Sequence, residues 1–345
     1  MTRYRTALAV VAAVIGFAVL LTIVRQPAPA SLQSPSNLFP VSDRTPAPEF
    51  TGLAGWINSA PLTVAGLRGH VVLVDFWTFS CVNCVRTLPH LKALYSRYHS
   101  DGLVIVGMHS PEFDFEKVAA NVRDAVSRLA VTWPVALDSQ MQTWNAYANN
   151  YWPAEYLIDK EGRLAYTHFG EGDYDTTAAA VAQLLGRKAP AAQSVSPPGA
   201  AITPELYAGS ARGTLADGER FGAQGRPVAY PDHGAPQATD LIQVTGTWAD
   251  QREYLEATAP GHVRLRFRAS EVFVVAGSAD SALMVSVQVD GAPPATGAAG
   301  PDLSGAELDV TRQDLFHVLT AQAAGYHLID LSVPAGFRLY TFTFG

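Results

Sequence analysis

Two cysteines, Cys81 and Cys84, stand three residues apart and are the only cysteines in the chain. They follow an apolar, β-branched run, Val71–Trp77, and they open a segment with helical periodicity at 82–99. The first amides of a helix lack intrahelical acceptors and the helix dipole is positive there, so this position stabilises a thiolate at Cys81. A thiolate is the attacking species in disulfide exchange. The spacing indicates a redox pair in which Cys81 is the nucleophile and the less exposed Cys84 resolves the mixed disulfide.

The cysteine count also excludes several classes of protein. One pair of cysteines cannot support a disulfide-stapled scaffold, and a zinc ribbon would need a second pair of ligands. The histidines of the C-terminal half have no metal-ligand spacing, so neither a metal site nor a cofactor is expected: His233, His262, His317 and His327.

Two further residues bear on the chemistry of the pair. Asp75 lies in the apolar run, six residues before Cys81. Burial there would raise the pKa of its carboxyl and let it exchange a proton with Cys84; the alternative is that Asp75 caps a strand end in water. Pro153 directly precedes an expected strand at 154–159, which suggests a tight turn in which a cis bond is one option.

The N-terminus reads as a targeting segment. The apolar run Thr6–Val24, with Arg3 and Arg5 before it and Arg25 after it, would reach about 28 Å as a helix, close to the ~30 Å hydrocarbon core. We expect a signal anchor with a cytoplasmic N-terminus and the bulk of the chain outside the cytoplasm, in the cell membrane as a single-pass protein. The alternative is secretion after cleavage near Ala28–Ala30.

Composition and linkers indicate two globular domains. The chain has 345 residues, 48% hydrophobic and 16% charged, which excludes a disordered chain, and its net charge of −7 argues against nucleic-acid binding. Prolines mark two spacers. The predicted divisions are an anchor at 1–25, a linker at 26–44, an α/β domain at 45–187, a second linker at 188–204 and a β domain at 205–345.

The two domains differ in their patterns. In the first, buried strands at 71–77 and 103–107 alternate with helical segments and precede a hairpin, which is typical of an α/β sandwich. In the second, about eight short alternating strands such as 262–268 suggest an all-β sandwich or jelly roll. It resembles carbohydrate-binding modules, and four aromatic residues could stack on a glycan if they are not core residues: Trp248, Tyr254, Tyr326 and Tyr340.

The first domain carries a further resemblance. The segment Val74–Cys84, followed by Arg86 and Pro89, resembles the active site of thioredoxin. It is most similar to the extracytoplasmic TlpA/ResA-like group and, within it, to the soluble C-terminal part of DipZ-type membrane proteins. The stretches 107–113 and 169–174 share that similarity.

The resemblance implies a thioredoxin fold and assigns roles to particular residues. These are a nucleophile, a resolving thiol, a buried acid, a cis-proline and two substrate-binding tryptophans: Cys81, Cys84, Asp75, Pro153, Trp77 and Trp152. Ser80 stands where thioredoxin has tryptophan, and Val82–Asn83 replaces the usual Gly-Pro, so the redox potential does not carry over.

Together these features predict a membrane-anchored, extracytoplasmic thiol–disulfide oxidoreductase. Its expected partners are proteins with thiols or disulfides, an unidentified electron donor in the membrane and a glycan on the β domain. Thr78, three residues before Cys81, completes half of a peroxidatic motif, so a peroxiredoxin-like thiol peroxidase is one alternative. Another is a non-catalytic carbohydrate- or protein-binding protein with a thioredoxin scaffold.

Overall fold

The computed structural model describes residues 37–190, 202–279, 281–320 and 325–345. The predicted anchor at 1–25 and most of the second linker lie outside these residues. In the part of the chain that is described, no helix combines the length and the apolar character needed to cross a membrane. Residues Ser36–Gly345 form one compact unit.

The first domain is built on a sheet of six strands in the order β1-β4-β3-β2-β5-β6. Strands β2, β3 and β4 are parallel to one another, whereas β1 runs antiparallel to β4, β5 to β2 and β6 to β5. The strands are β1 (Trp56–Ile57), β2 (Val71–Trp77), β3 (Leu103–His109), β4 (Val135–Leu137), β5 (Ala154–Ile158) and β6 (Leu164–Phe169).

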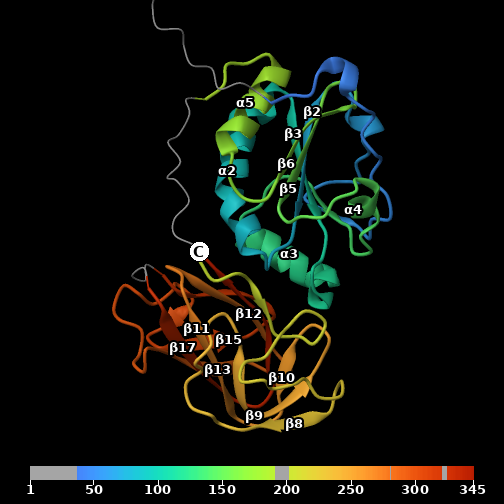
Figure 1. Cartoon of the computed structure of the whole chain (residues 1–345). Coiled ribbons are helices and arrows are strands. Elements are labelled where there is room, and N and C mark those ends of the chain that lie inside the picture. Colours follow the sequence, from blue (N-terminus) through green and yellow to red (C-terminus); the bar gives the residue numbers. More distant parts are fainter. Residues whose placement is uncertain (1–36, 191–201, 280, 321–324) are drawn as a thin grey trace, which may run out of the picture. The chain divides into compact units, whose positions relative to one another are not determined.

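Helices cover both faces of this sheet, which explains why β2 is apolar without alternation. Figure 1 shows α2 and α5 on one side of the sheet and α4 on the other. One face of β2, including Leu73, packs in the core with α2, α3 and α5, while the other, including Phe76, packs with α4 and the N-terminal segment. The helices are α2 (Val82–Tyr98), α3 (Ala119–Arg128), α4 (Gln142–Ala146) and α5 (Tyr174–Leu185), with short 3-10 turns at Val41–Asp43, Ala65–Leu67, His99–Asp101 and Asp114–Lys117.

This topology places the cysteines at the end of the central strand. All seven residues of β2 are buried, and Cys81, four residues after the strand, is the N-cap of α2. The parallel β2–β3 pair, the antiparallel β5–β6 hairpin and the flanking helices form a thioredoxin fold, so the predicted fold of this domain is confirmed.

The C-terminal domain is all-β, as predicted, with more strands than the sequence pattern indicated. It holds β7 (Leu206–Tyr207), β8 (Pro227–Tyr230), β9 (Gln243–Asp250), β10 (Leu255–Ala257), β11 (Gly261–Phe267), β12 (Val272–Ser278), β13 (Leu283–Val289), β14 (Leu303–Ser304), β15 (Glu307–Val310), β16 (Asp314–Leu319), β17 (His327–Val333) and β18 (Phe337–Phe344). Their hydrogen bonds form one continuous, barrel-like sheet around a single core. The predicted separation into the two sheets of a sandwich is therefore not confirmed.

Strand β9 joins the two halves of this sheet because it bends at Gly246. Its first part pairs with β11, through Thr245 opposite His262, and its second part pairs with β10, through Trp248 opposite Ala257. Gly246 has φ +92°, and a Cβ there would lie 2.8 Å from the carbonyl oxygen of Pro260. Only glycine takes this conformation without strain.

Candidate functional site

The two cysteines occupy different environments at the N-terminus of α2. Cys81 is half-buried, and its Sγ accepts a hydrogen bond of 3.2 Å from the backbone N–H of Cys84. Cys84 is 1% exposed, and both are free thiols. Burial, followed by the contact with Cys81, raises the pKa of the Cys84 thiol well above its usual value. The arrangement offers a reachable sulfur at a positive helix end and a second sulfur directly behind it.

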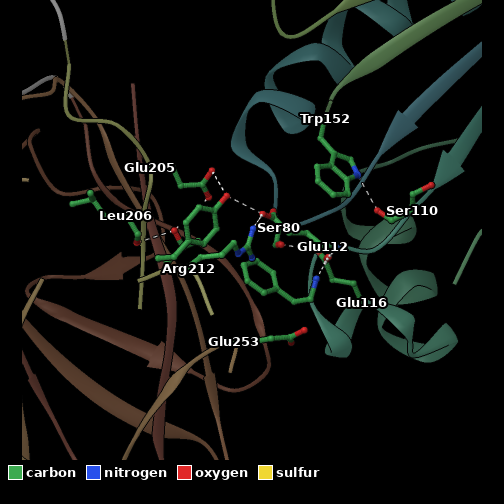
Figure 2. Close-up of polar contacts among 12 residues, drawn as sticks. Ser80, Ser110, Glu112, Glu116, Trp152, Glu205, Leu206, Arg212 and Glu253 are labelled. Carbon is green, nitrogen blue, oxygen red and sulfur yellow. Dashed lines mark hydrogen bonds and ion pairs between the residues drawn. The ribbon is translucent and has the colours of Figure 1, made fainter. Parts of the chain in front are cut away.

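The loop before β5 packs against the same core as the cysteine turn. The Trp152–Pro153 bond is cis, and the half-buried Trp152 packs against the same hydrophobic cluster as Cys81. Its indole N–H donates a hydrogen bond of 2.9 Å to the carbonyl oxygen of Ser110, at the end of β3 (Figure 2). Trp152 therefore connects the proline loop to the segment that follows β3.

Trp77 does not lie at this surface, which corrects the expectation that it contacts substrate. It is 1% exposed and packs in the core beneath the helices. Side chains alternate along a strand, so Trp77 shares the inward face of β2 with Leu73 and Asp75. Its contribution is to packing.

Asp75 lies in the interior beneath the cysteines rather than at a strand end in water. The carboxyl is 1% exposed, and burial, with a smaller contribution from Glu155, raises its pKa well above the usual value. A charge on Asp75 in turn raises the pKa of the Cys84 thiol, so the two groups interact. Proton exchange between Asp75 and Cys84 stays a prediction.

A second buried carboxyl, which sequence reasoning missed, is bonded to Ser80, the residue before Cys81. Glu116 accepts hydrogen bonds from the Ser80 hydroxyl at 2.5 Å and from the backbone N–H groups of Glu112 and Phe113 at 2.6 and 3.0 Å (Figure 2). Burial raises its pKa to about 7 despite these bonds. No local pattern marked Glu116, because its partner Ser80 is 36 residues away in the sequence.

The C-terminal domain holds the segment that contains Glu116. Arg212 donates to Glu112 at 2.6 Å, and the Tyr207 hydroxyl donates to the same carboxylate at 2.9 Å (Figure 2). Glu253 accepts a bond of 2.8 Å from the backbone N–H of Asp114. The segment between β3 and α3 is therefore bonded to the cysteine turn on one side and to the C-terminal domain on the other.

The Thr78 hydroxyl contacts a histidine, while the Thr78 carbonyl oxygen accepts a bond of 3.4 Å from the backbone N–H of Cys81. The hydroxyl lies 3.3 Å from Nε2 of His109, and both side chains are buried. Burial lowers the pKa of His109 to about 3, so this histidine is neutral at physiological pH. The Thr78 hydroxyl therefore satisfies a buried ring nitrogen.

The aromatic residues considered for glycan stacking are divided between core and surface. Trp248 is buried, which corrects its assignment to a sugar platform, whereas Tyr340 is buried apart from a small area that lines a cavity. Tyr326 is exposed, and the half-buried Tyr254 lines the same cavity, of about 430 Å³, together with Arg338 and several amide side chains. Within the ranges that the structure describes, no cluster of three or more histidine, cysteine, aspartate or glutamate side chains could hold a metal ion.

A free, half-exposed thiol at the N-terminus of the helix that follows the central strand, with a buried thiol one turn on, defines a thioredoxin-like thiol–disulfide oxidoreductase. The comparisons agree. The chain belongs to this family: it is 30% identical over 129 residues to the thiol-disulfide oxidoreductase YkuV of Bacillus subtilis, a match covering 37% of this chain and 85% of YkuV.

Other matches extend beyond the thioredoxin domain. The Redoxin family model matches residues 42–185, and the model described as "Thioredoxin like C-terminal domain" matches residues 203–345. Protein DipZ of Mycobacterium tuberculosis and of Mycobacterium bovis is 34% identical over 314 residues, covering 87% of this chain but 43% of DipZ. The chain thus spans less than half the length of these relatives. A crystal structure of a thioredoxin-like superfamily protein, 28% identical, covers 42% of this chain and 99% of its own with a TM-score of 0.39.

Proposed function

We propose that this chain exchanges disulfides with client proteins, with Cys81 as nucleophile and Cys84 as resolving thiol. The observation that carries the proposal is the unequal exposure of the pair: Cys81 is reachable at the start of α2, whereas Cys84 is buried behind it and donates its backbone N–H to the Cys81 sulfur. The member of the pair that attacks first must be accessible, and the one that closes the reaction need not be.

The exchange balances with the two thiols alone. The Cys81 thiolate attacks one sulfur of a client disulfide, which forms an S–S bond to Cys81 and releases a client thiolate. Cys84 then loses its proton to Asp75 and attacks Cys81. The second client sulfur leaves as a thiolate, two electrons pass to the client, and Cys81–Cys84 becomes a disulfide.

Exposed aromatic side chains beside the site favour a polypeptide client. Tyr151 and Phe169 are 54% and 47% exposed, and their ring centroids lie 5.2 Å apart. Tyr151 adjoins Trp152, whose backbone would face the client. Such a patch suits apolar side chains of an unfolded or extended chain rather than a small polar thiol.

The site of action that we propose is outside the cytoplasm, with the chain held at the membrane by its N-terminal apolar run. The support is the length and flanking charge of that run and the similarity to DipZ. An oxidised pair must then be reduced again, so the proposal includes an electron donor in the membrane. Labelling intact and lysed source cells with a membrane-impermeant maleimide tests this placement: labelling of Cys81 only after lysis would contradict it.

We propose that the C-terminal domain braces the site, that is, it holds the segments that flank the cysteines in place. Its bonds to Glu112 and Asp114, and the 3.2 Å ion pair between Glu271 and Arg86 of α2, lie on segments that flank the cysteines. A glycan ligand stays a second proposal for this domain, supported by the cavity beside Tyr254, which is lined by both aromatic and amide side chains. A glycan array with the full chain tests it, and an array without signal would leave bracing as the domain's role.

Insulin reduction by the full chain tests the catalytic proposal. Wild type should reduce insulin, Cys81→Ser should lose the activity, and Cys84→Ser should accumulate a mixed disulfide that is visible on a non-reducing gel. Equal rates for wild type and Cys81→Ser would exclude exchange through this pair. Thr78→Val is the matched control for peroxidase chemistry: exchange should persist in it, and rapid, Cys81-dependent consumption of hydrogen peroxide by wild type that Thr78→Val loses would instead favour the peroxidase.

A further inference from the structure

Three ionisable side chains form a row across the sheet, directly beneath the cysteines. Asp75 of β2 pairs in register with Glu155 of β5, and Glu155 pairs in register with His168 of β6. Facing side chains on paired antiparallel strands have Cβ atoms about 4.5–5.5 Å apart. Because β6 is the last strand in the order β1-β4-β3-β2-β5-β6, the row runs from the central strand to an edge.

All three side chains point to the same side of the sheet as Cys84. Alternate residues of a strand share a face. Leu73, Leu157 and Tyr166 each lie two residues from a member of the row, and all three are core residues beneath α2 and α5. Cys84 belongs to this same cluster. The row therefore lies on the face of the sheet that packs against the core containing Cys84.

The burial of this row is unusual for charged residues. Asp75 and Glu155 are 1% and 3% exposed, and buried carboxyls are normally paired with a base or fully hydrogen-bonded. Among the described residues, Oδ1 of Asp75 and Nε2 of His168 are buried without a hydrogen-bond partner. Glu155 is bonded to α5: its Oε2 accepts a hydrogen bond of 2.7 Å from the Thr177 hydroxyl.

The groups that face the carboxyls come from every neighbouring element. Cys84 lies above Asp75 on α2, Tyr166 of β6 contacts the Thr177 hydroxyl at 3.2 Å, and the pKa of Tyr174 on α5 is raised by burial and also by Glu155. Burial raises the pKa of Glu155, while Thr177 and then His168 act in the opposite direction. His168 is thus the base that interacts with this pair.

We propose that Glu155 and His168 relay the proton of Cys84 from Asp75 to the edge of the sheet. This inference rests on the proposed function and adds two positioning residues to it. Two adjacent buried carboxyls do not both ionise readily, so the pair holds one proton between them. When Cys84 gives its proton to Asp75, the pair holds two, and Glu155 passes one to the imidazole of His168. The imidazolium then releases it to solvent, and no other reactant is needed.

A chromogenic aromatic disulfide, dithionitrobenzoate, separates the two steps of exchange in the reduced full chain. Attack by Cys81 releases the first coloured thiolate, and attack by Cys84 releases the second. Glu155→Gln keeps the size of the side chain and an acceptor for Thr177 but cannot carry a proton. We expect it to slow the second release about a hundredfold, the lower end of the range for proton transfer by a positioned group, and to leave the first unchanged.

His168→Ala should slow the second release to a similar extent, and added imidazole should restore it, which loss of a merely structural role would not allow. The matched control is His70→Asn, an exposed histidine next to the first residue of β2, which should leave both releases unchanged. Second-release rates equal to wild type in both Glu155→Gln and His168→Ala, over pH 6–9, would overturn the relay. A wild type that gives no first release would contradict the proposed function itself.

If Glu155→Gln impairs folding, the circular dichroism spectrum will show it. The test of the relay is then whether imidazole restores the second release in His168→Ala. The relay would also be overturned if the second release is slowed, added imidazole does not restore it and its pH profile is unchanged. Without the proton carrier, the rate of the second release must depend differently on the hydroxide concentration. A shift of the profile toward a simple rise with pH would support it.

Discussion

The buried carboxyl of Glu116 should make the protein less stable as the pH rises, and Glu116→Gln should remove that dependence. Glu116 is 1% exposed and accepts three hydrogen bonds, from Ser80, Glu112 and Phe113. Glutamine has the same shape and retains an acceptor for the two backbone N–H groups, while its amide can donate to the Ser80 hydroxyl. The substitution therefore removes the ionisation with little change in packing.

The magnitude follows from the raised pKa. Burial moves the pKa of Glu116 from 4.5 to about 7. The folded state thus binds the proton more tightly than the unfolded state. The protonated carboxyl costs nothing at low pH, and stability is lost as the pH rises from about 4.5 to 7. One pKa unit is worth about 1.4 kcal/mol, so the whole loss is about 3 kcal/mol, of which about 2.5 kcal/mol falls between pH 5 and pH 8.

Urea unfolding of wild type and Glu116→Gln at pH 5, 6, 7 and 8 measures this loss. Other buried carboxyls with raised pKa values, such as Asp138 and Glu155, titrate in both proteins and cancel in the difference. The free energy of unfolding of the variant, minus that of wild type, should increase as the pH rises. An exposed glutamate provides the control, since Glu161→Gln should follow wild type at every pH. Parallel curves for wild type and Glu116→Gln would refute the assignment.

Two further predictions concern the C-terminal domain. Arg212→Ala removes the ion pair with Glu112 and the stacking of the guanidinium 3.6 Å from the ring centre of Tyr207; the cost should be about 1–2 kcal/mol, seen as faster amide hydrogen exchange at 112–117, and unchanged exchange would argue against bracing. Gly246→Ala places a Cβ 2.8 Å from a carbonyl oxygen at positive φ; it should lower stability by more than about 1 kcal/mol, and an unaltered Tm would contradict the role of the β9 bend.

The part of the site that the sequence revealed is the part encoded by short-range pattern. A continuous apolar strand, a cysteine at a helix start and a second cysteine one turn later are all readable within 71–84. The β5–β6 hairpin was recognisable because its turn residues lie between two alternating runs. Hydrophobic periodicity and turn chemistry act over a few residues, so these elements could be predicted without knowing the rest of the fold.

The features that the sequence did not reveal depend on strand register and on whether an aromatic side chain points into the core or toward solvent. Glu155 and His168 become neighbours of Asp75 only because β5 and β6 pair with β2 in one particular register. Trp77 and Trp248 are aromatic residues near expected surfaces, yet both point inward. The two-sheet interpretation of the C-terminal half is not confirmed, because β9 pairs with β11 before Gly246 and with β10 after it, and no single-strand pattern shows that one strand serves two partners.

The two thiols have different neighbours. Cys81 follows Ser80, which is bonded to Glu116 and, through the backbone of Glu112, to the segment that the C-terminal domain holds. Cys84 faces inward, toward Asp75 and the row behind it. A change in the C-terminal domain should therefore act on the first attack, and a change in the row should act on the second. Because Arg212 bonds to Glu112 whereas Glu155 bonds to Thr177, a double variant that combines Arg212→Ala with Glu155→Gln should show each single effect unaltered, in its own kinetic phase.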